Sequence, residues 1–189
     1  MTIGLEFECH VFKLENPKLK PEECAHPPTP PDVSMITHGY QYMSEKSYDE
    51  LDSLITIFRN SLDSIGMPLA TFEIEWGPGQ CEVTFTPRDA LMAADQALLY
   101  RTAVKQFCQR NGYHASFMAI PNIPNTFPVG WHLHQTLNER AGNNVFTASE
   151  GDGPFSPKGM AYMGGLLKYA SETALLSTPT VTGYKRLRP

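Results

Sequence analysis

Two histidines separated by one residue give this sequence its clearest chemical signal. His132 and His134 lie in 129-VGWHLHQTL-137, where apolar and polar residues alternate as they do in a β-strand. Side chains at positions i and i+2 of a strand point to the same face of the sheet, so both imidazoles face the same way. A lone histidine is usually a core or surface residue, but a pair on one face can bind a metal ion or a ligand that the metal holds.

Glutamates recur at the same spacing on other predicted strands. One strand glutamate is usually a solvated residue on the outer face of a half-buried sheet. That interpretation weakens when several strands share the pattern among Val, Ile, Phe and Trp, because a buried carboxylate needs a cationic partner. These strands carry almost no lysine or arginine, so a metal ion is the simplest partner. The glutamates are Glu6, Glu8, Glu73, Glu75 and Glu82.

The ligand types favour a hard divalent cation. Carboxylates with one or two imidazoles suit Mg²⁺ or Mn²⁺, whereas zinc prefers more nitrogen and sulfur. We therefore predict that one histidine joins the glutamates as a ligand, and that its neighbour contacts the group that the metal holds. The four cysteines have no CxxC spacing, which argues against a structural zinc site.

The elements that must position these residues follow from the apolar periodicity. Strands and helices alternate without a strict βαβ rhythm, which predicts an α+β fold with an antiparallel or mixed sheet and helices on one side. The proline-rich residues 17–32 are expected to be irregular, and no element is predicted over 178–189. Strands are predicted at 3–13, 70–76, 81–85, 114–121 and 129–137, and helices at 47–65, 86–111 and 157–176.

Two helix starts carry capping signals. Ser47 and Glu50 have the spacing of a capping box, and Thr86 followed by Pro87 is typical of an N-cap and first helical position. Both helices are therefore expected to begin at these residues.

The composition is that of a globular domain that lacks the signature of several other classes. The chain has 189 residues, of which 41% are apolar and 19% charged, and a net charge of −5. This acidic balance argues against a nucleic-acid partner, and no apolar run is long enough to cross a membrane. Carboxylates near the N-terminus do not fit a signal peptide, so reduced thiols and a cytoplasmic location are expected.

Five motifs, in order along the chain, resemble the catalytic domain of glutamine synthetase. The likeness is to the bacterial type I enzymes and their γ-glutamyl-amide synthetase relatives, and it covers the whole chain but only the middle of the family's enzyme. It implies a curved sheet with helices on its outer face, a guanido-kinase-like fold, and a partial catalytic domain over 1–189, incomplete at both ends. The motifs are GLEFECHVF (4–12), HGYQY (38–42), EWGPGQCEV (75–83), VGWHLHQTL (129–137) and GGLLKYA with TPTVTGYKRLRP (164–170 and 178–189).

The resemblance implies two divalent metal sites. Glu8, Glu75 and Glu82 match the ligands of the metal near the amino-acid substrate. Glu6 and His132 match two ligands of the metal between the nucleotide phosphates.

The resemblance also implies substrate contacts and a reaction. His134 matches a histidine that contacts the phosphates, Arg186 an arginine that holds the substrate carboxylate, and Tyr40 a tyrosine near the amine pocket. ATP would phosphorylate the γ-carboxylate of glutamate, and ammonia or an organic amine would then displace phosphate to give an amide. The intact protein would be a homo-oligomer, a ring-based dodecamer.

The sequence departs from the family pattern in two ways. It has no counterpart of the N-terminal small domain, or of the later glutamate, arginines and flap of the active site, so the chain alone is expected to be a weak or inactive ligase. Phe127-Pro128 stands where glutamine synthetases have Asn-Gly, and proline removes a backbone donor. Together with 17–32 this favours an organic amine as acceptor, while ammonia stays open.

Three other functions remain open on the sequence alone. One is a phosphotransferase that acts on a guanidinium group, which the motifs at 75–83 and 129–137 argue against. Another is a non-catalytic scaffold or inactive fragment, although a scaffold has no physical reason to retain metal ligands. The third is a structural Ca²⁺ or Mg²⁺ site, which predicts metal-dependent stability without nucleotide binding.

Overall fold

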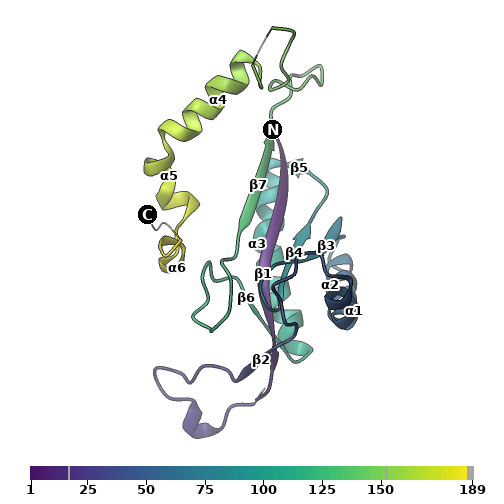
Figure 1. The fold of residues 1–189 in the computed structure, drawn as a ribbon, viewed down its shortest axis with the longest axis vertical. Coiled ribbons are helices and arrows are strands. Elements are labelled where there is room, and N and C mark those ends of the chain that lie inside the picture. The colour runs from purple at the N-terminus through teal and green to yellow at the C-terminus, as the bar shows by residue number, and fades with distance from the viewer. Residues whose placement is uncertain (17, 152, 187–189) are drawn as a thin grey trace.

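One long strand organises the fold. In the computed structural model, which describes residues 1–16, 18–151 and 153–186, β1 (Thr2–Leu14) pairs antiparallel with five other strands, and β3 extends the sheet beyond β4 (Figure 1). The remaining strands are β2 (Val33–Met35), β3 (Thr71–Ile74), β4 (Gln80–Thr84), β5 (Arg88–Asp89), β6 (Tyr113–Ser116) and β7 (Trp131–Thr136). The helices are η1 (Pro21–Glu23, a 3₁₀ turn), α1 (Glu45–Glu50), α2 (Asp52–Asp63), α3 (Ala90–Arg110), α4 (Pro157–Lys168), α5 (Ala170–Ser177) and α6 (Val181–Tyr184).

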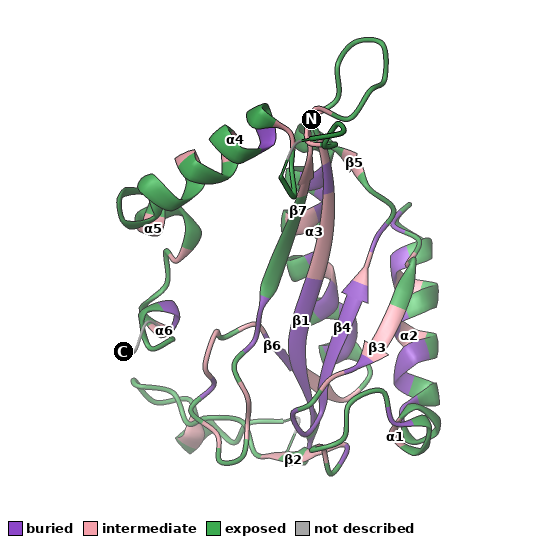
Figure 2. Ribbon diagram, turned by 45° about the horizontal axis from the view of Figure 1, so that its top comes forward, coloured by how far each residue is buried: buried purple, intermediate pink, exposed green. Residues whose placement is uncertain are grey.

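Alternation along β1 gives the sheet one apolar and one polar face. Phe7, Cys9 and Val11 are buried in the main hydrophobic core, and Glu6 and Glu8 point to the opposite face. Helices α2 and α3 cover the apolar face, and their buried residues face the central strands (Figure 2). The predicted α+β fold with helices on one side is confirmed, and every pairing among the described strands is antiparallel.

The core between helices and sheet is largely aromatic and aliphatic. Tyr100 of α3 stacks on Phe7 of β1, with ring centroids 4.8 Å apart. The apolar stripe predicted for the first long helix is buried as expected through Leu62. Ile65 is instead 42% exposed, because α2 ends at Asp63 and the chain turns away at Gly66.

The helix predicted at 47–65 is two helices, and its predicted capping box is wrong. The side chain of Ser44 caps α1 by accepting a hydrogen bond from the Ser47 N–H, so Ser47 lies inside the first turn. The two helices are separated at Leu51, whose ψ of 4° departs from helical geometry.

The predicted start of the long helix is also wrong. Thr86 does not cap α3; Asp89 does, by accepting hydrogen bonds from the N–H groups of Leu91 and Met92. The reason is tertiary, because Arg88–Asp89 form β5 and pair with the start of β1 before the helix can begin. The predicted stop at Asn111-Gly112 is confirmed.

The C-terminal helices differ from their prediction in detail. The helix expected at 157–176 breaks at Tyr169, where φ is −105° and ψ is 15°. Within 178–189, where no element was predicted, Thr180 caps the short helix α6, and residues 187–189 lie outside the described part. Helices α4 and α5 extend along one side of the molecule, away from the core under α2 and α3 (Figure 1).

Two features bear on the expected class of protein. Cys9, Cys24, Cys81 and Cys108 are all free thiols, and Cys24 is exposed while the other three are buried. Nowhere in the described ranges is a helix both long enough and apolar enough to cross a membrane.

Candidate metal and substrate site

Strand register brings the acidic residues of three strands into one row. Glu8 of β1 lies opposite Glu82 of β4, and Glu82 in turn lies opposite Glu73 of β3. On the other side of β1, Glu6 pairs with His132 of β7. Because cross-strand partners on one face lie side by side, residues far apart in the chain share one polar surface.

Three of these side chains meet closely enough to hold a cation. One ligand atom each from Glu6, Glu82 and His132 lies within 4.8 Å of the other two. Two carboxylate oxygens and an imidazole nitrogen form a donor set that suits Mg²⁺ or Mn²⁺. Glu82 is buried, Glu6 is half-buried and His132 is exposed, so a cation held there would also reach a ligand in solvent.

The electrostatics of Glu82 also fit a cation. Burial raises the pKa of Glu82 to about 7, and the neighbouring carboxylates act in the same direction. Burial likewise raises the pKa of Glu75, although the Trp76 N–H donates to its carboxylate at 3.1 Å and opposes this. Crowded carboxylates without a cationic neighbour are destabilised in their ionised form, and a divalent ion would relieve that repulsion. The carboxylates that act on Glu82 are Glu6, Glu75, Glu8 and Glu73.

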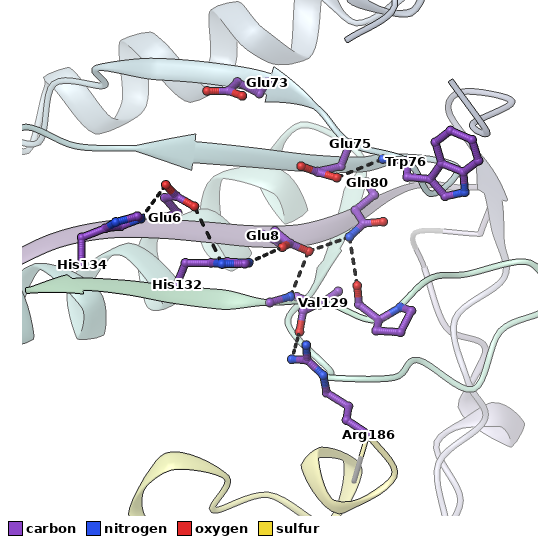
Figure 3. Close-up of polar contacts among 12 residues, drawn as sticks. Glu6, Glu8, Glu73, Glu75, Trp76, Gln80, Val129, His132, His134 and Arg186 are labelled. Atoms are coloured by element: carbon purple, nitrogen blue, oxygen red, sulfur yellow. Dashed lines mark hydrogen bonds and ion pairs between the residues drawn. The ribbon is translucent and has the colours of Figure 1, made fainter. Parts of the chain in front are cut away.

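Glu8 lies in a hydrogen-bond network beside this group. Its Oε2 accepts from Gln80 Nε2 at 2.7 Å and from the Gly130 N–H at 2.9 Å, and its Oε1 lies 2.9 Å from His132 Nε2 (Figure 3). Gly130 is essential to this arrangement, because a Cβ there would lie 2.5 Å from His132 Nε2 and 2.6 Å from Glu8 Oε1. The network therefore orients His132.

Both predicted histidines converge on Glu6. His134 Nε2 lies 2.7 Å from Glu6 Oε1, and His132 Nδ1 lies 3.9 Å from Glu6 Oε2 (Figure 3). The inference that the two imidazoles share one face is therefore confirmed. His134 lies one position further along the row and is exposed, with room to contact a bound ligand.

The two remaining predicted residues lie at the edge of this surface. Arg186 donates from Nη1 to the Val129 carbonyl at 2.8 Å, so its guanidinium approaches the segment before β7 (Figure 3). Tyr40 contacts the rings of Trp76 and Phe127. The roles of all eight predicted residues stay predictions, because geometry alone does not test what they bind.

Sequence and structure comparisons agree on the family. The chain matches "Glutamine synthetase, catalytic domain" over residues 1–189. It is 42% identical over 192 residues to a gamma-glutamylanilide synthase from Acinetobacter sp, covering 98% of this chain and 38% of that protein. A glutamine synthetase from Methanosarcina mazei is 30% identical over 192 residues, covering 100% of this chain and 39% of that protein. The chain belongs to the glutamine synthetase catalytic-domain family.

Solved structures show the same glutamine synthetase fold. "Apo GmaS without ligand" superposes with a TM-score of 0.77 at 26% identity, over 99% of this chain and 41% of that one. "GmaS/ADP complex-Conformation 1" gives a TM-score of 0.70 at 26% identity, over 100% and 41%. The predicted family and fold are thus confirmed, and the chain spans about two fifths of the length of these glutamine synthetase relatives.

The sequence prediction missed two residues that shape this glutamine synthetase site. Gln80 bridges Glu8 and the Pro128 carbonyl with its amide, while its Oε1 accepts from the Gly77 N–H. His10, two positions after Glu8 on the same face of β1, is fully buried. The period-two pattern that selected Glu6 and Glu8 also includes His10, so that signal could have found it.

Proposed function

We propose that this chain is the central part of an ATP-dependent ligase that joins the γ-carboxyl group of glutamate to ammonia or to an organic amine. The observation that carries the proposal is the group of Glu6, Glu82 and His132, set among further carboxylates on the polar face of a glutamine synthetase-type sheet. Two relatives of the chain are named for a γ-glutamyl anilide and for glutamine, which are amides of the same carboxyl group, and this supports the proposal.

Each predicted residue has a role that its position supports. Glu8, Glu75 and Glu82 would hold one divalent cation, and Glu6 and His132 would supply two ligands of a second. The carboxylate of Glu82 also lies beside Glu6 and His132, so the two cations would be neighbours. His134, exposed beside Glu6, would contact the nucleotide phosphates. A bound divalent ion supplies positive charge where the transferred phosphoryl group carries negative charge.

Arg186 and Tyr40 would serve the substrates. Arg186 donates to the carbonyl of Val129, the residue before Gly130 in the site, and its guanidinium would hold the carboxylate of glutamate. Tyr40 lies beside Trp76, which follows Glu75 directly, and it would border the acceptor amine.

The proposed reaction consists of two nucleophilic displacements, the first of which releases ADP and the second phosphate. A γ-carboxylate oxygen of glutamate attacks the terminal phosphorus of ATP, the bond to the bridging oxygen breaks, and ADP leaves. The amine nitrogen then attacks the acyl carbon, and the carbon–oxygen bond to phosphate breaks. Phosphate leaves with the electron pair, and the nitrogen loses a proton to water. Phosphorylation is needed because a free carboxylate is a poor electrophile at neutral pH.

The partial length of the chain limits what it would do alone. Residues 1–189 would be a partial catalytic domain, and a complete active site would need the segments that its longer relatives also contain. We propose a homo-oligomer for the complete protein, a ring-based dodecamer as the family resemblance implies, located in the cytoplasm where ATP and glutamate are abundant.

Release of ADP tests the proposal directly. The complete gene product that contains residues 1–189 would be incubated with ATP, glutamate and Mg²⁺ or Mn²⁺, against ammonia and a panel of alkylamines and arylamines. We expect amine-dependent ADP release that the Glu82→Gln and His132→Ala variants abolish. Metal binding without ADP release for any amine would contradict the ligase and favour a scaffold or a structural metal site.

A further inference from the structure

Three aromatic side chains from separate segments meet beside the carboxylates. The ring centroids of Tyr40 and Phe127 are 5.9 Å apart, and Trp76 lies 6.4 Å from each. All three contacts are edge-to-face, with interplanar angles of 73–84°. We call these residues the aromatic triad.

The aromatic triad is exposed, although such rings usually belong in a core. Tyr40 and Trp76 are each 43% exposed, and Phe127 is half-buried. Trp76 follows Glu75 directly, and its backbone N–H donates to the Glu75 carboxylate at 3.1 Å. The triad is therefore continuous with the polar face of the sheet, on the side opposite the main core.

Backbone hydrogen bonds hold the three segments in place. The Tyr40 N–H donates to the Trp76 carbonyl at 2.7 Å, and Tyr40 has a φ of 65°, which non-glycine residues rarely adopt. A Cβ on Gly77 would lie 3.1 Å from the Cβ of Phe127, so the turn after Trp76 and the Phe127 loop are in direct contact. The rings do not depend on their mutual contacts alone for their position.

The side chain of His10 contacts two of these segments, the turn after Trp76 and the loop that contains Phe127. Its Nδ1 lies 3.0 Å from the Pro78 carbonyl and its Nε2 lies 3.0 Å from the Phe127 carbonyl, and the imidazole is fully buried. A buried polar side chain that spans two surface loops makes their spacing rigid, because either loop could move only by leaving a buried group unpaired.

We infer that the aromatic triad binds the ring of an arylamine acceptor and so selects arylamines over ammonia and alkylamines. This inference rests on the proposed ligase function. The triad suits a flat ring better than a cation, because its edge-to-face rings fill the space between them and leave no cage for an ammonium group. A planar ligand would instead stack on Trp76 and Tyr40, each of which is 43% exposed, with its nitrogen toward the carboxylates.

The acid–base chemistry of the acceptor agrees with this geometry. An arylamine is a weak base and is uncharged at neutral pH, so it enters without losing the hydration of a cation. Its nitrogen lone pair is free to attack, and no proton must be removed first. An alkylamine is protonated at the same pH and would have to lose a proton beside the acyl phosphate.

Substitutions at Trp76 test whether the aromatic triad makes the enzyme prefer an arylamine to an alkylamine. Trp76→Leu keeps an apolar side chain and removes the aromatic face, whereas Trp76→Phe keeps a ring. Tyr169→Leu is a matched control at an exposed aromatic residue between α4 and α5. ADP release by the complete gene product would be measured with aniline and with isopropylamine. We expect Trp76→Leu to lower the aniline/isopropylamine ratio of kcat/KM at least tenfold, mainly through the KM for aniline. Trp76→Phe should lower this ratio much less, and Tyr169→Leu should have the wild-type ratio.

The outcomes separate this inference from the proposed function. Wild-type turnover with ammonia or isopropylamine but not with aniline would overturn the inference and leave the ligase intact. An equal loss for both amines in Trp76→Leu, or no loss in a variant with the wild-type unfolding midpoint, would also overturn it. Absence of turnover with every amine would overturn the ligase itself, and the inference with it.

Discussion

At Glu82, burial and four neighbouring carboxylates all raise the pKa of the carboxyl group. The side chain is 8% exposed and shares its row with Glu8 and Glu73, so its ionised form is doubly unfavourable. A core that had to be stable without a ligand would not place these groups together. These residue-scale features agree with the proposed cation site.

The raised pKa of Glu82 predicts a specific pH dependence for the metal-free protein. The unfolded chain ionises this carboxyl near its ordinary pKa of 4.5, but the folded chain keeps the proton until about pH 7. Between these values the unfolded state binds fewer protons, so the free energy of unfolding falls as the pH rises. Relative to Glu82→Gln, which lacks this titration, the wild type should lose on the order of 2 kcal/mol between pH 4 and pH 8.

Urea unfolding of both proteins in EDTA at pH 4, 6 and 8 measures this difference. Added Mn²⁺ should restore stability to the wild type at pH 8 and have little effect on Glu82→Gln. A difference between the two proteins that does not change with pH would contradict the assignment of the raised pKa to Glu82.

Gly130 provides a second prediction at the residue scale. A methyl group there would collide with His132 Nε2 and Glu8 Oε1, and neither can retreat without breaking its hydrogen bond. We expect Gly130→Ala to weaken Mn²⁺ binding at least tenfold, as measured by calorimetry. Gly164→Ala, in open space on helix α4, is the control and should leave binding unchanged. Equal affinities for the two variants would show that the geometry around His132 is not needed.

At the scale of elements, pairing with β1 decides where the helices and the site residues lie. Strand β5 occupies only Arg88 and Asp89, yet it moves the start of α3 three residues beyond the position that the sequence predicts. In the same way, β1 aligns Glu6 with His132 through its register with β7. Pairing with the long central strand therefore determines where α3 begins, and it determines which residues lie next to one another in the site.

The position of the α3 cap can be tested at this scale. Asp89→Ala removes the acceptor of two backbone N–H groups and should lower the free energy of unfolding by about 1 kcal/mol. Thr86→Ala is the matched control, and its effect should stay within roughly 0.5 kcal/mol. Chemical denaturation of both variants measures the difference. A larger loss for Thr86→Ala would instead favour the cap that the sequence suggests.

At the scale of the whole molecule, helices α4 and α5 carry an unusual number of exposed apolar side chains. Leu167 is 76% exposed and Leu176 is 81% exposed. Among the described residues, Gly159 is the one buried residue of α4 and α5 has none, whereas α2 and α3 each bury an apolar face against the sheet, although α3 also exposes Leu91 and Leu98. Apolar side chains exposed together on two successive helices are typical of a surface that another segment or another copy of the chain covers. This agrees with the fact that the chain spans only about two fifths of its relatives.

This apolar surface predicts self-association of the isolated 189-residue chain. Sedimentation at increasing protein concentration should show species larger than a monomer, because exposed leucines on neighbouring copies bury one another. Substituting Leu167, Leu175 and Leu176 together with lysine should shift the chain to monomer. The control is a double Leu91→Lys, Leu98→Lys variant, which adds charge at two exposed leucines of α3. It should self-associate as the wild type does. Unchanged association in the triple variant would place the contact on another surface.

The sequence by itself determined which side chains share a face, because alternation in a strand is a local property of the backbone. It therefore paired Glu6 with Glu8 and His132 with His134, and it indicated the family through motifs that are themselves local. Only the tertiary structure decided which strands lie side by side. Register across β1 joined Glu6, Glu82 and His132 into one group, and left Glu8 hydrogen-bonded to Gln80 and Gly130.

The same physical reason explains the other differences. The cap at Asp89, the burial of His10 and the meeting of the aromatic triad all depend on partners far away in the chain. Local propensity cannot encode such contacts, since the same residues would cap or pack differently beside other neighbours. For this protein the residue types specify the chemistry, and strand register specifies which of them can act together.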